Sequence, residues 1–247
     1  MMSDAVSTPG APRTWYFFGT LGFALLASLA SILGGLLTIA VLGLAYHVPP
    51  TARYDELFDR ADWEAAISLG IFLGQFAVIW LAIRLARRQF SEYLALKWPT
   101  REQLFLALLI MFGVLHLLGF IEPLVGEATD AGLIAEYKAA QADGPLLFFL
   151  YLVTGCIGAP IFEEFMVRGF LLRGWSESFL RPTGAIVLTS VLWACCHVQY
   201  DWFGVFEVFV SGLLLGYFRY RSGSTWLTVV MHSANNLYAY LLIGLTV

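Results

Sequence analysis

Charged residues are scarce in this chain of 247 residues. Only 13% of them are Asp, Glu, Lys or Arg, and 59% are hydrophobic, whereas about 25% are charged in an ordinary soluble domain. No Lys/Arg-rich run occurs, and the formal net charge is −4. Because nucleic acid is bound mainly through clustered basic groups that neutralise phosphates, the sequence predicts no nucleic-acid partner. The composition instead indicates an integral membrane protein, with membrane lipid as a partner.

Cysteine is also rare, and its placement predicts neither a disulfide framework nor a thiol enzyme. Cys156, Cys195 and Cys196 lie in apolar segments without a CxxC motif, and such residues are usually small buried hydrophobes. Cys195 and Cys196 adjoin His197, which raises the possibility of thiol catalysis. Neighbours on a helix diverge by about 100°, so Cys196 and His197 are poorly placed to form a Cys–His pair.

Long uncharged runs dominate the rest of the chain and predict an all-α, polytopic membrane helix bundle. Seven transmembrane helices are expected, at about 15–46, 65–86, 104–121, 145–166, 184–198, 203–218 and 225–245. Aromatic and charged residues interleave over 90–98, as in a segment at the headgroup level. The polar stretch 123–144 is expected to form a loop with one short helix near 135–142.

The distribution of basic residues predicts the orientation, because cytoplasmic loops carry an excess of Lys and Arg. With a cytoplasmic N-terminus, only Arg53, Arg60 and Lys138 of the 14 basic residues fall outside. The sequence therefore predicts a protein of the plasma membrane with four parts. These are a cytoplasmic tail (1–14) expected to remain attached, N-terminal transmembrane helices (15–122), an extracytoplasmic loop (123–144) and a bundle that carries the candidate site (145–247).

An acidic pair interrupts the fourth predicted span. Near the centre of a membrane helix an ionised acid opposes insertion by about 2.5–3.5 kcal/mol, so Glu163 and Glu164 need a structural or functional reason. Glu164 and Arg168 are four residues apart, the favourable order for an ion pair on one helix face. Glu163 points about 100° away and is left to meet another helix. It is either a catalytic base or an acid that snorkels at a helix end.

Three more polar groups lie in the late helices. His197 is expected near the end of the fifth helix, and His232 and Asn236 share one face of the seventh because they are four residues apart. An imidazole and a carboxamide aimed at one point would form an oxyanion hole. A single His in an apolar helix, such as His116, is more often a hydrogen-bonded core residue. Four polar groups on three helices, with Glu163 among them, favour a site.

These residues form three short patterns, and in this order the patterns resemble the motifs of a known family. The patterns are Glu163-Glu164-xxx-Arg168, Trp193-xxx-His197 and His232-xxx-Asn236. The chain resembles the CPBP intramembrane proteases, also called the CAAX-protease and bacteriocin-processing or Abi family, related to the Ras-converting prenyl-protein endopeptidase. The resemblance covers about 146–245 and includes the linking stretches 209–216 and 223–224. The second motif usually opens with Phe and here has Trp193, an aromatic replacement expected to preserve packing.

The resemblance implies a hydrolase that cleaves a membrane-associated protein or peptide. Glu163 and His197 would bind and activate a water, and His232 and Asn236 would stabilise the oxyanion of the tetrahedral intermediate. The alternative is a membrane protein that binds a peptide or lipid without cleaving it, in bacteriocin immunity, transport or as a chaperone. Neither prenylation of the substrate nor an oligomeric state is implied.

The resemblance also implies supporting residues, and it leaves metal dependence open. Glu164 and Arg168 would orient Glu163 and offset its charge. The HExxH motif is absent, and Glu163, His197 and His232 would serve equally to hold a zinc ion or a metal-free water.

Overall fold

The computed structural model describes residues 13–48, 61–124 and 131–246. Within these ranges every regular element is helical and no strand occurs, which confirms the predicted all-α class. The elements are α1 (Tyr16–Ala45), α3 (Ala61–Leu85), α4 (Phe90–Tyr93), α5 (Arg101–Ile121), η1 (Glu122–Leu124), α6 (Ala131–Ala142), α7 (Pro145–Val153), η2 (Thr154–Gly158), α8 (Ala159–Glu164), η3 (Phe165–Leu171), α9 (Leu172–Ser176), α10 (Arg181–Cys195), α11 (Trp202–Ser222) and α12 (Thr225–Thr246).

Five helices of the described part of the chain are long and apolar enough to cross a membrane. They are Tyr16–Ala45, Asp62–Leu85, Arg101–Leu124, Pro145–Ser176 and Trp202–Ser222. Large hydrophobic side chains stay exposed along α1, α3 and α5, as expected of helices that face lipid. An integral membrane protein is thus confirmed in outline, but the expected count of seven spans is not. The helix α10 has only 15 residues. The helix α12 is continuous, but its apolar sequence is interrupted by polar residues such as His232 and Asn236.

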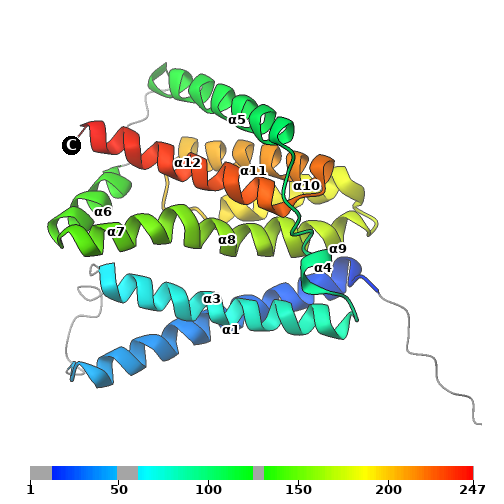
Figure 1. Ribbon diagram of the computed structural model, residues 1–247, viewed down its shortest axis with the longest axis horizontal. Coiled ribbons are helices and arrows are strands. Elements are labelled where there is room, and N and C mark those ends of the chain that lie inside the picture. Colours follow the sequence, from blue (N-terminus) through cyan, green and yellow to red (C-terminus); the bar gives the residue numbers. More distant parts are fainter. Residues whose placement is uncertain (1–12, 49–60, 125–130, 247) are drawn as a thin grey trace, which may run out of the picture.

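The helices are arranged around one long central helix, which runs from α7 through α8 to α9 (Figure 1). The paired helices α1 and α3 pack on one side of it, and α10, α11 and α12 pack on the other. Helix α5 lies beyond them and contacts α11 and α12. The predicted site residues Glu163 and Glu164 are in the middle of this central helix, which places them at the interior of the bundle.

The central helix is longer than the predicted span 145–166, because it continues to Ser176. Two π-helical segments, η2 and η3, interrupt it on either side of α8. Such wider turns release backbone groups from the regular helical pattern and often occur at functional sites. They flank the short segment that carries the acidic pair.

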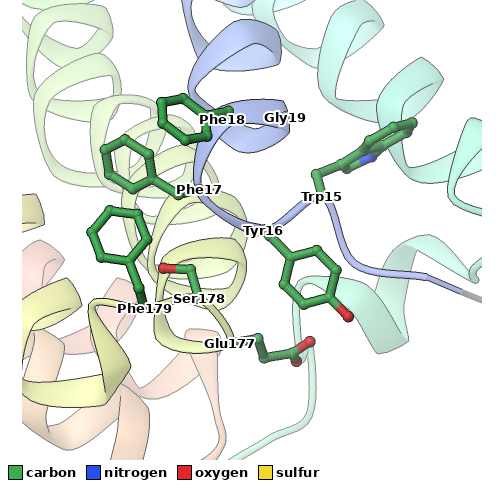
Figure 2. Close-up of a pocket in the computed structure, with 8 residues that line it drawn as sticks. All are labelled: Trp15, Tyr16, Phe17, Phe18, Gly19, Glu177, Ser178 and Phe179. Carbon is green, nitrogen blue, oxygen red and sulfur yellow. The ribbon is translucent and has the colours of Figure 1, made fainter.

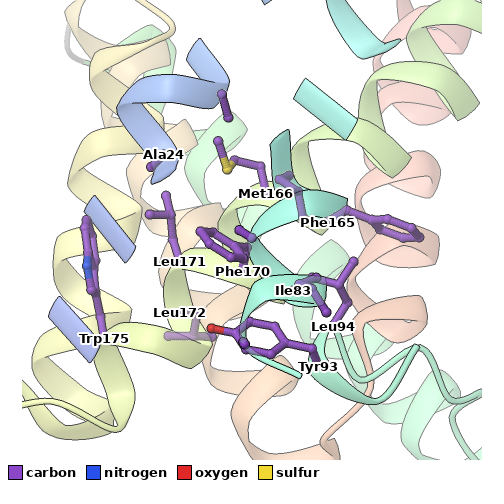
Figure 3. Packing of buried hydrophobic residues seen from close by; sticks show 14 of the residues in the cluster. Ala24, Ile83, Tyr93, Leu94, Phe165, Met166, Phe170, Leu171, Leu172 and Trp175 are labelled. Atoms are coloured by element: carbon purple, nitrogen blue, oxygen red, sulfur yellow. The ribbon is translucent and has the colours of Figure 1, made fainter. Parts of the chain in front are cut away.

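The largest hydrophobic core lies where α1, α3 and α4 meet the C-terminal part of the central helix (Figure 3). Phe170, Trp175, Ile83 and Leu94 are among its most completely buried side chains. The indole N–H of Trp175 donates a hydrogen bond to the carbonyl of Phe17 at 3.2 Å. This core fixes the N-terminal helix pair against the helix that carries the acidic residues.

The stretch 123–144 contains the helix α6, which confirms the expected short helix near 135–142. Tyr137 and Ala140 of α6 are buried against Tyr151 and Ile243. Helix α6 is therefore a packed part of the bundle. Its extracytoplasmic side, like the cytoplasmic tail and the other domain boundaries, stays a prediction.

The stretch Gly223–Ser224 sets the start of α12. Gly223 ends α11 in the left-handed conformation, at φ 61°, which glycine adopts without steric cost. The hydroxyl of Ser224 accepts a hydrogen bond from the backbone N–H of Leu227 at 3.1 Å and donates one to the carbonyl of Lys97. The backbone N–H of Thr225 donates to the carbonyl of Ala95. The helix that carries His232 is thereby anchored at its first turn.

Glycines allow α1 and α3 to pack backbone against backbone. A Cβ atom on Gly74 would overlap the carbonyl of Ala30, and Cβ atoms on Gly34 and Gly70 would overlap the backbone of each other's residue. The spacing of Gly70 and Gly74 is the small-residue pattern of close membrane helix pairs. Helix α1 runs without interruption through Gly34 and Gly35.

We expect Gly74→Ala to destabilise the protein by about 1–3 kcal/mol, because the added methyl group forces the two backbones apart. The matched control is Gly22→Ala in α1, where an added Cβ meets nothing within 4 Å. Thermal unfolding in detergent should show a lower midpoint for the first variant and an unchanged or higher one for the second. Equal midpoints would contradict the close packing of α1 and α3.

Candidate active site

A cavity of about 480 Å³ lies among α5, α8, α11 and α12, and all four predicted catalytic residues line it. Glu163, His197, His232 and Asn236 come from three regions that are far apart in the sequence. The other lining residues are Leu115, Gly119, Glu122, Leu133, Gly155, Ala159, Trp193, Gln199, Tyr200, Gly204, Glu207, Val208, Ser211, Asn235, Tyr238, Ala239, Tyr240, Leu242 and Ile243. The lining includes three carboxylates and no Lys or Arg.

Glu163 is held by a tryptophan. Its carboxylate atom Oε2 accepts a hydrogen bond from the indole N–H of Trp193 at 2.6 Å, a short distance typical of bonds to a charged acceptor. Glu163 is half-buried and faces the cavity. It meets residues of other helices, as its position off the Glu164–Arg168 face predicted.

His197 lies just outside a helix, which corrects the expected fifth span to 198. The helix α10 ends at Cys195, and the N–H of His197 bonds to the carbonyl of Ala194 in a tighter turn. Its Nδ1 atom is 2.7 Å from the carbonyl oxygen of Trp193. Because a carbonyl only accepts, Nδ1 carries the proton, and Nε2 of the neutral ring is left with a lone pair.

His232 belongs to a buried charged cluster with Glu164 and Arg168. Glu164 and Arg168 form the ion pair expected from their spacing, with Nη1 2.9 Å from Oε1 and both side chains fully buried. The same Oε1 atom is 3.1 Å from Nδ1 of His232. A carboxylate that is paired with Arg168 accepts hydrogen bonds, so Nδ1 of His232 donates here. The sequence did not reveal this contact, because Glu164 and His232 are 68 positions apart.

Arg168 makes two further contacts that offset part of the cost of burying its charge, although its Nε atom has no hydrogen-bond partner in the described part of the chain. Its Nη2 donates to the carbonyl of Gly212 at 3.3 Å, and its Cζ lies 4.3 Å from the ring centre of Trp193. Close helix packing brings that carbonyl near, because a Cβ on Gly212 would press on Ser190. The stretch 209–216 therefore supplies a backbone acceptor for the charged cluster.

Asn236 is fixed by the first π-helical segment. Its Nδ2 atom donates to the carbonyl of Gly155 at 2.9 Å, and the second N–H of the same amide group is left to point elsewhere. A Cβ on Gly155 would collide with the hydroxyl of Tyr240. The absence of a side chain at Gly155 thus lets α12 approach closely enough for the bond to Asn236.

The residues proposed for a zinc site do not assemble into one. Among the described residues, no group of three or more His, Cys, Asp or Glu side chains is placed to hold a metal ion. Glu163, His197 and His232 line one cavity but are not among any such group. The bonds at Nδ1 of the two histidines do not decide the matter, because a metal-bound histidine commonly donates its other ring N–H in the same way. The arrangement gives no support to the zinc alternative.

Two other expectations are corrected. Cys195 and Cys196 are exposed, so their interpretation as buried hydrophobes is wrong. Both lie at the C-terminal end of α10. His116 is hydrogen-bonded as expected, through Nδ1 to the carbonyl of Phe112 and through Nε2 to the hydroxyl of Tyr238. It is exposed, however, and is no core residue.

A second cavity, of about 510 Å³, lies at the start of α1 and is unrelated to the predicted residues (Figure 2). It is lined mainly by aromatic side chains, and Glu177 is the one acid or base among its lining residues. They are Trp15, Tyr16, Phe17, Phe18, Gly19, Glu177, Ser178 and Phe179. The cavity that holds Glu163 and the two histidines is the better candidate for chemistry.

Comparison with known proteins agrees with the motifs. Residues 145–238 match the family described as Rce1-like, type II CAAX prenyl endopeptidase, which confirms the resemblance over that part of the chain. The matched part includes Glu163, His197, His232 and Asn236. No solved structure was found to match the chain.

Two curated relatives are uncharacterized. The chain is 24% identical over 243 residues to the uncharacterized protein YyaK of Bacillus subtilis (strain 168), which covers 90% of this chain and 75% of that protein. It is 35% identical over 86 residues to an uncharacterized 24.3 kDa protein of Escherichia coli, which covers 34% of this chain and 39% of that protein. Neither name states an activity.

We expect Arg168→Ala to cost about 3–5 kcal/mol in stability, because it leaves the carboxylate of Glu164 buried without its cation. Glu164→Gln combined with Arg168→Met should be milder, since both charges are removed together. The matched control is Arg88→Ala, which breaks an exposed pair with Glu92 and should cost at most about 1 kcal/mol. Unfolding in detergent measures all three, and a parent-like Arg168→Ala would remove the supporting role of the pair.

Proposed function

We propose that this chain is an intramembrane endopeptidase that hydrolyses a peptide bond of a membrane-associated protein or peptide. The observation that carries the proposal is the convergence of three sequence motifs on one cavity. The match of residues 145–238 to the type II CAAX prenyl endopeptidase family supports the same reaction class. That the substrate is prenylated is no part of the proposal.

Glu163 is the general base in this proposal. A water held between its free carboxylate oxygen and the Nε2 lone pair of His197 attacks the carbonyl carbon of the scissile bond. The water's proton passes to Glu163 and then to the departing amine, so that a carboxylic acid and an amine leave the site. A base of this kind contributes when it lies within hydrogen-bond reach of the water it activates.

His232 and Asn236 stabilise the oxyanion that forms when water attacks. The second amide N–H of Asn236 is a neutral donor, so it can donate to the oxyanion without a change of protonation. Nδ1 of His232 already donates to Glu164, so Nε2 donates to an oxyanion only when the imidazole carries both protons. The carboxylate of Glu164 is the counter-charge for that form. Donors fixed in advance around a developing charge are a large source of rate enhancement.

The rival proposal is a protein that binds a peptide or lipid in the same cavity without cleaving it. Intramembrane acids and histidines also serve binding and proton transfer, and a fold persists when its chemistry is lost. The two proposals differ in what Glu163→Gln does, because that change keeps the shape of the cavity and removes the base.

The protein lies in the plasma membrane with a cytoplasmic N-terminus in this proposal. In a background without Cys156, Cys195 and Cys196, we expect a membrane-impermeant thiol reagent applied to intact cells to label a cysteine at Gln141. It should not label one at Ser91. Both positions are exposed, so accessibility after membrane disruption is the control. Labelling of Ser91→Cys alone would reverse the orientation.

We expect Glu163→Gln, His197→Ala and His232→Ala each to abolish peptide cleavage by purified protein in lipid while the protein stays folded. Asn236→Ala should lose about 10²–10³ in rate, because one oxyanion donor is removed and another remains. Cys196→Ser is the control and should stay active. If the parent cleaves no candidate peptide and Glu163→Gln retains the cellular function, the binding role replaces the enzyme.

A further inference from the structure

Trp193 contacts more of the candidate site than any predicted catalytic residue. Its indole N–H donates to Oε2 of Glu163 at 2.6 Å, and its backbone carbonyl accepts from Nδ1 of His197 at 2.7 Å. Its ring faces the guanidinium of Arg168 at 4.3 Å and meets the ring of His232 edge-on at 5.3 Å between centres. One residue therefore contacts a group from each of the three motifs.

The hydrogen bond to Glu163 distinguishes the two oxygens of the carboxylate. An indole nitrogen is a donor only, so Oε2 is committed to Trp193 and Oε1 is the oxygen left to accept a proton from water. A donor at 2.6 Å also restricts rotation of the carboxylate. Without it, the terminal torsion of a glutamate is broad and the group has no preferred direction.

The indole of Trp193 is itself held in place by Arg168. Arg168 is fixed by Glu164 and by the carbonyl of Gly212, and its flat guanidinium lies against one face of the Trp193 ring. A cation over an aromatic face is attracted to it, more strongly where water is excluded. The buried ion pair thereby fixes the indole, and the indole in turn fixes the carboxylate of Glu163.

We infer that Trp193 is a positioning residue that directs Oε1 of Glu163 toward the attacking water. The inference rests on the proposed function and adds a role that packing alone does not supply. The Phe that usually opens this motif in the family fills similar space but has no N–H to donate. Trp193 therefore adds a polar contact that was not predicted from the sequence.

Trp193→Phe tests this role, because it keeps an aromatic ring and removes the donor. We expect kcat to fall about 10- to 100-fold, the order of loss from misplacing a reacting group, with KM unchanged because the cavity keeps its aromatic wall. Trp175→Phe is the matched control. It also removes a buried indole N–H bond, to the carbonyl of Phe17, but lies outside the cavity and should lower stability without changing kcat.

A spectroscopic measurement separates the hydrogen bond from its effect on rate. In protein labelled with ¹⁵N-tryptophan, the indole proton of Trp193 is identified by its loss in Trp193→Phe. It should be shifted downfield in the parent and move upfield in Glu163→Ala, while the signal of Trp175 stays in place. A purely structural tryptophan would show no such response to the loss of the carboxylate.

Two results would overturn the inference. One is an active parent whose Trp193→Phe variant keeps kcat within about twofold, well short of the 10- to 100-fold loss expected from a misplaced group. The other is an indole signal of Trp193 that does not respond to Glu163→Ala. A parent that cleaves nothing counts against the proposed function instead, and the indole signal then still decides whether Trp193 holds the carboxylate.

Discussion

The ion pair between Glu164 and Arg168 constrains the rest of the structure, because both side chains are fully buried in a protein that lies in a membrane. Removing two charges from water costs several kcal/mol per ion, and their attraction offsets this only when hydrogen bonds satisfy the remaining polar atoms. Some of those bonds come from other helices, while Nε of Arg168 has no hydrogen-bond partner among the described residues. His232 of α12 donates to Glu164, the carbonyl of Gly212 in α11 accepts from Arg168, and Trp193 of α10 covers the guanidinium.

The same contacts build the candidate site. Two of the groups that stabilise the buried pair, His232 and Trp193, line the cavity of the candidate site. His232 is oriented by Glu164, and Trp193 holds both Glu163 and the ring of His197. The pair is hydrogen-bonded to His232, and Trp193 is hydrogen-bonded to Glu163 and His197. The two groups join in one network where the guanidinium of Arg168 lies over the indole of Trp193. In such a network the energies of single contacts are not additive.

Local spacing predicted several features correctly. Uncharged runs indicated a helical membrane protein, and the four-residue spacing of Glu164 and Arg168 indicated their ion pair, because both depend on neighbours along one helix. Predictions that depended on the ends of helices were less successful. His197 lies beyond α10 and Cys196 is exposed, because the C-terminal end of a helix is decided by competing turns and by what covers it. Only five of the seven expected spans meet the length and composition of a membrane-spanning helix in the described residues, because α10 is short and α12 contains polar residues.

The sequence by itself determined the helical class, the membrane location and the set of residues that form the three motifs, because hydropathy and periodicity are properties of a single segment. The tertiary structure decided which atoms of those residues meet. The contacts of Glu164 with His232 and of Glu163 with Trp193 join positions 68 and 30 residues apart, so no local pattern encodes them. Close helix packing at glycines is decided at the same level: the absence of a side chain lets Gly155 lie against Tyr240 of α12 and Gly212 of α11 lie against Ser190 of α10.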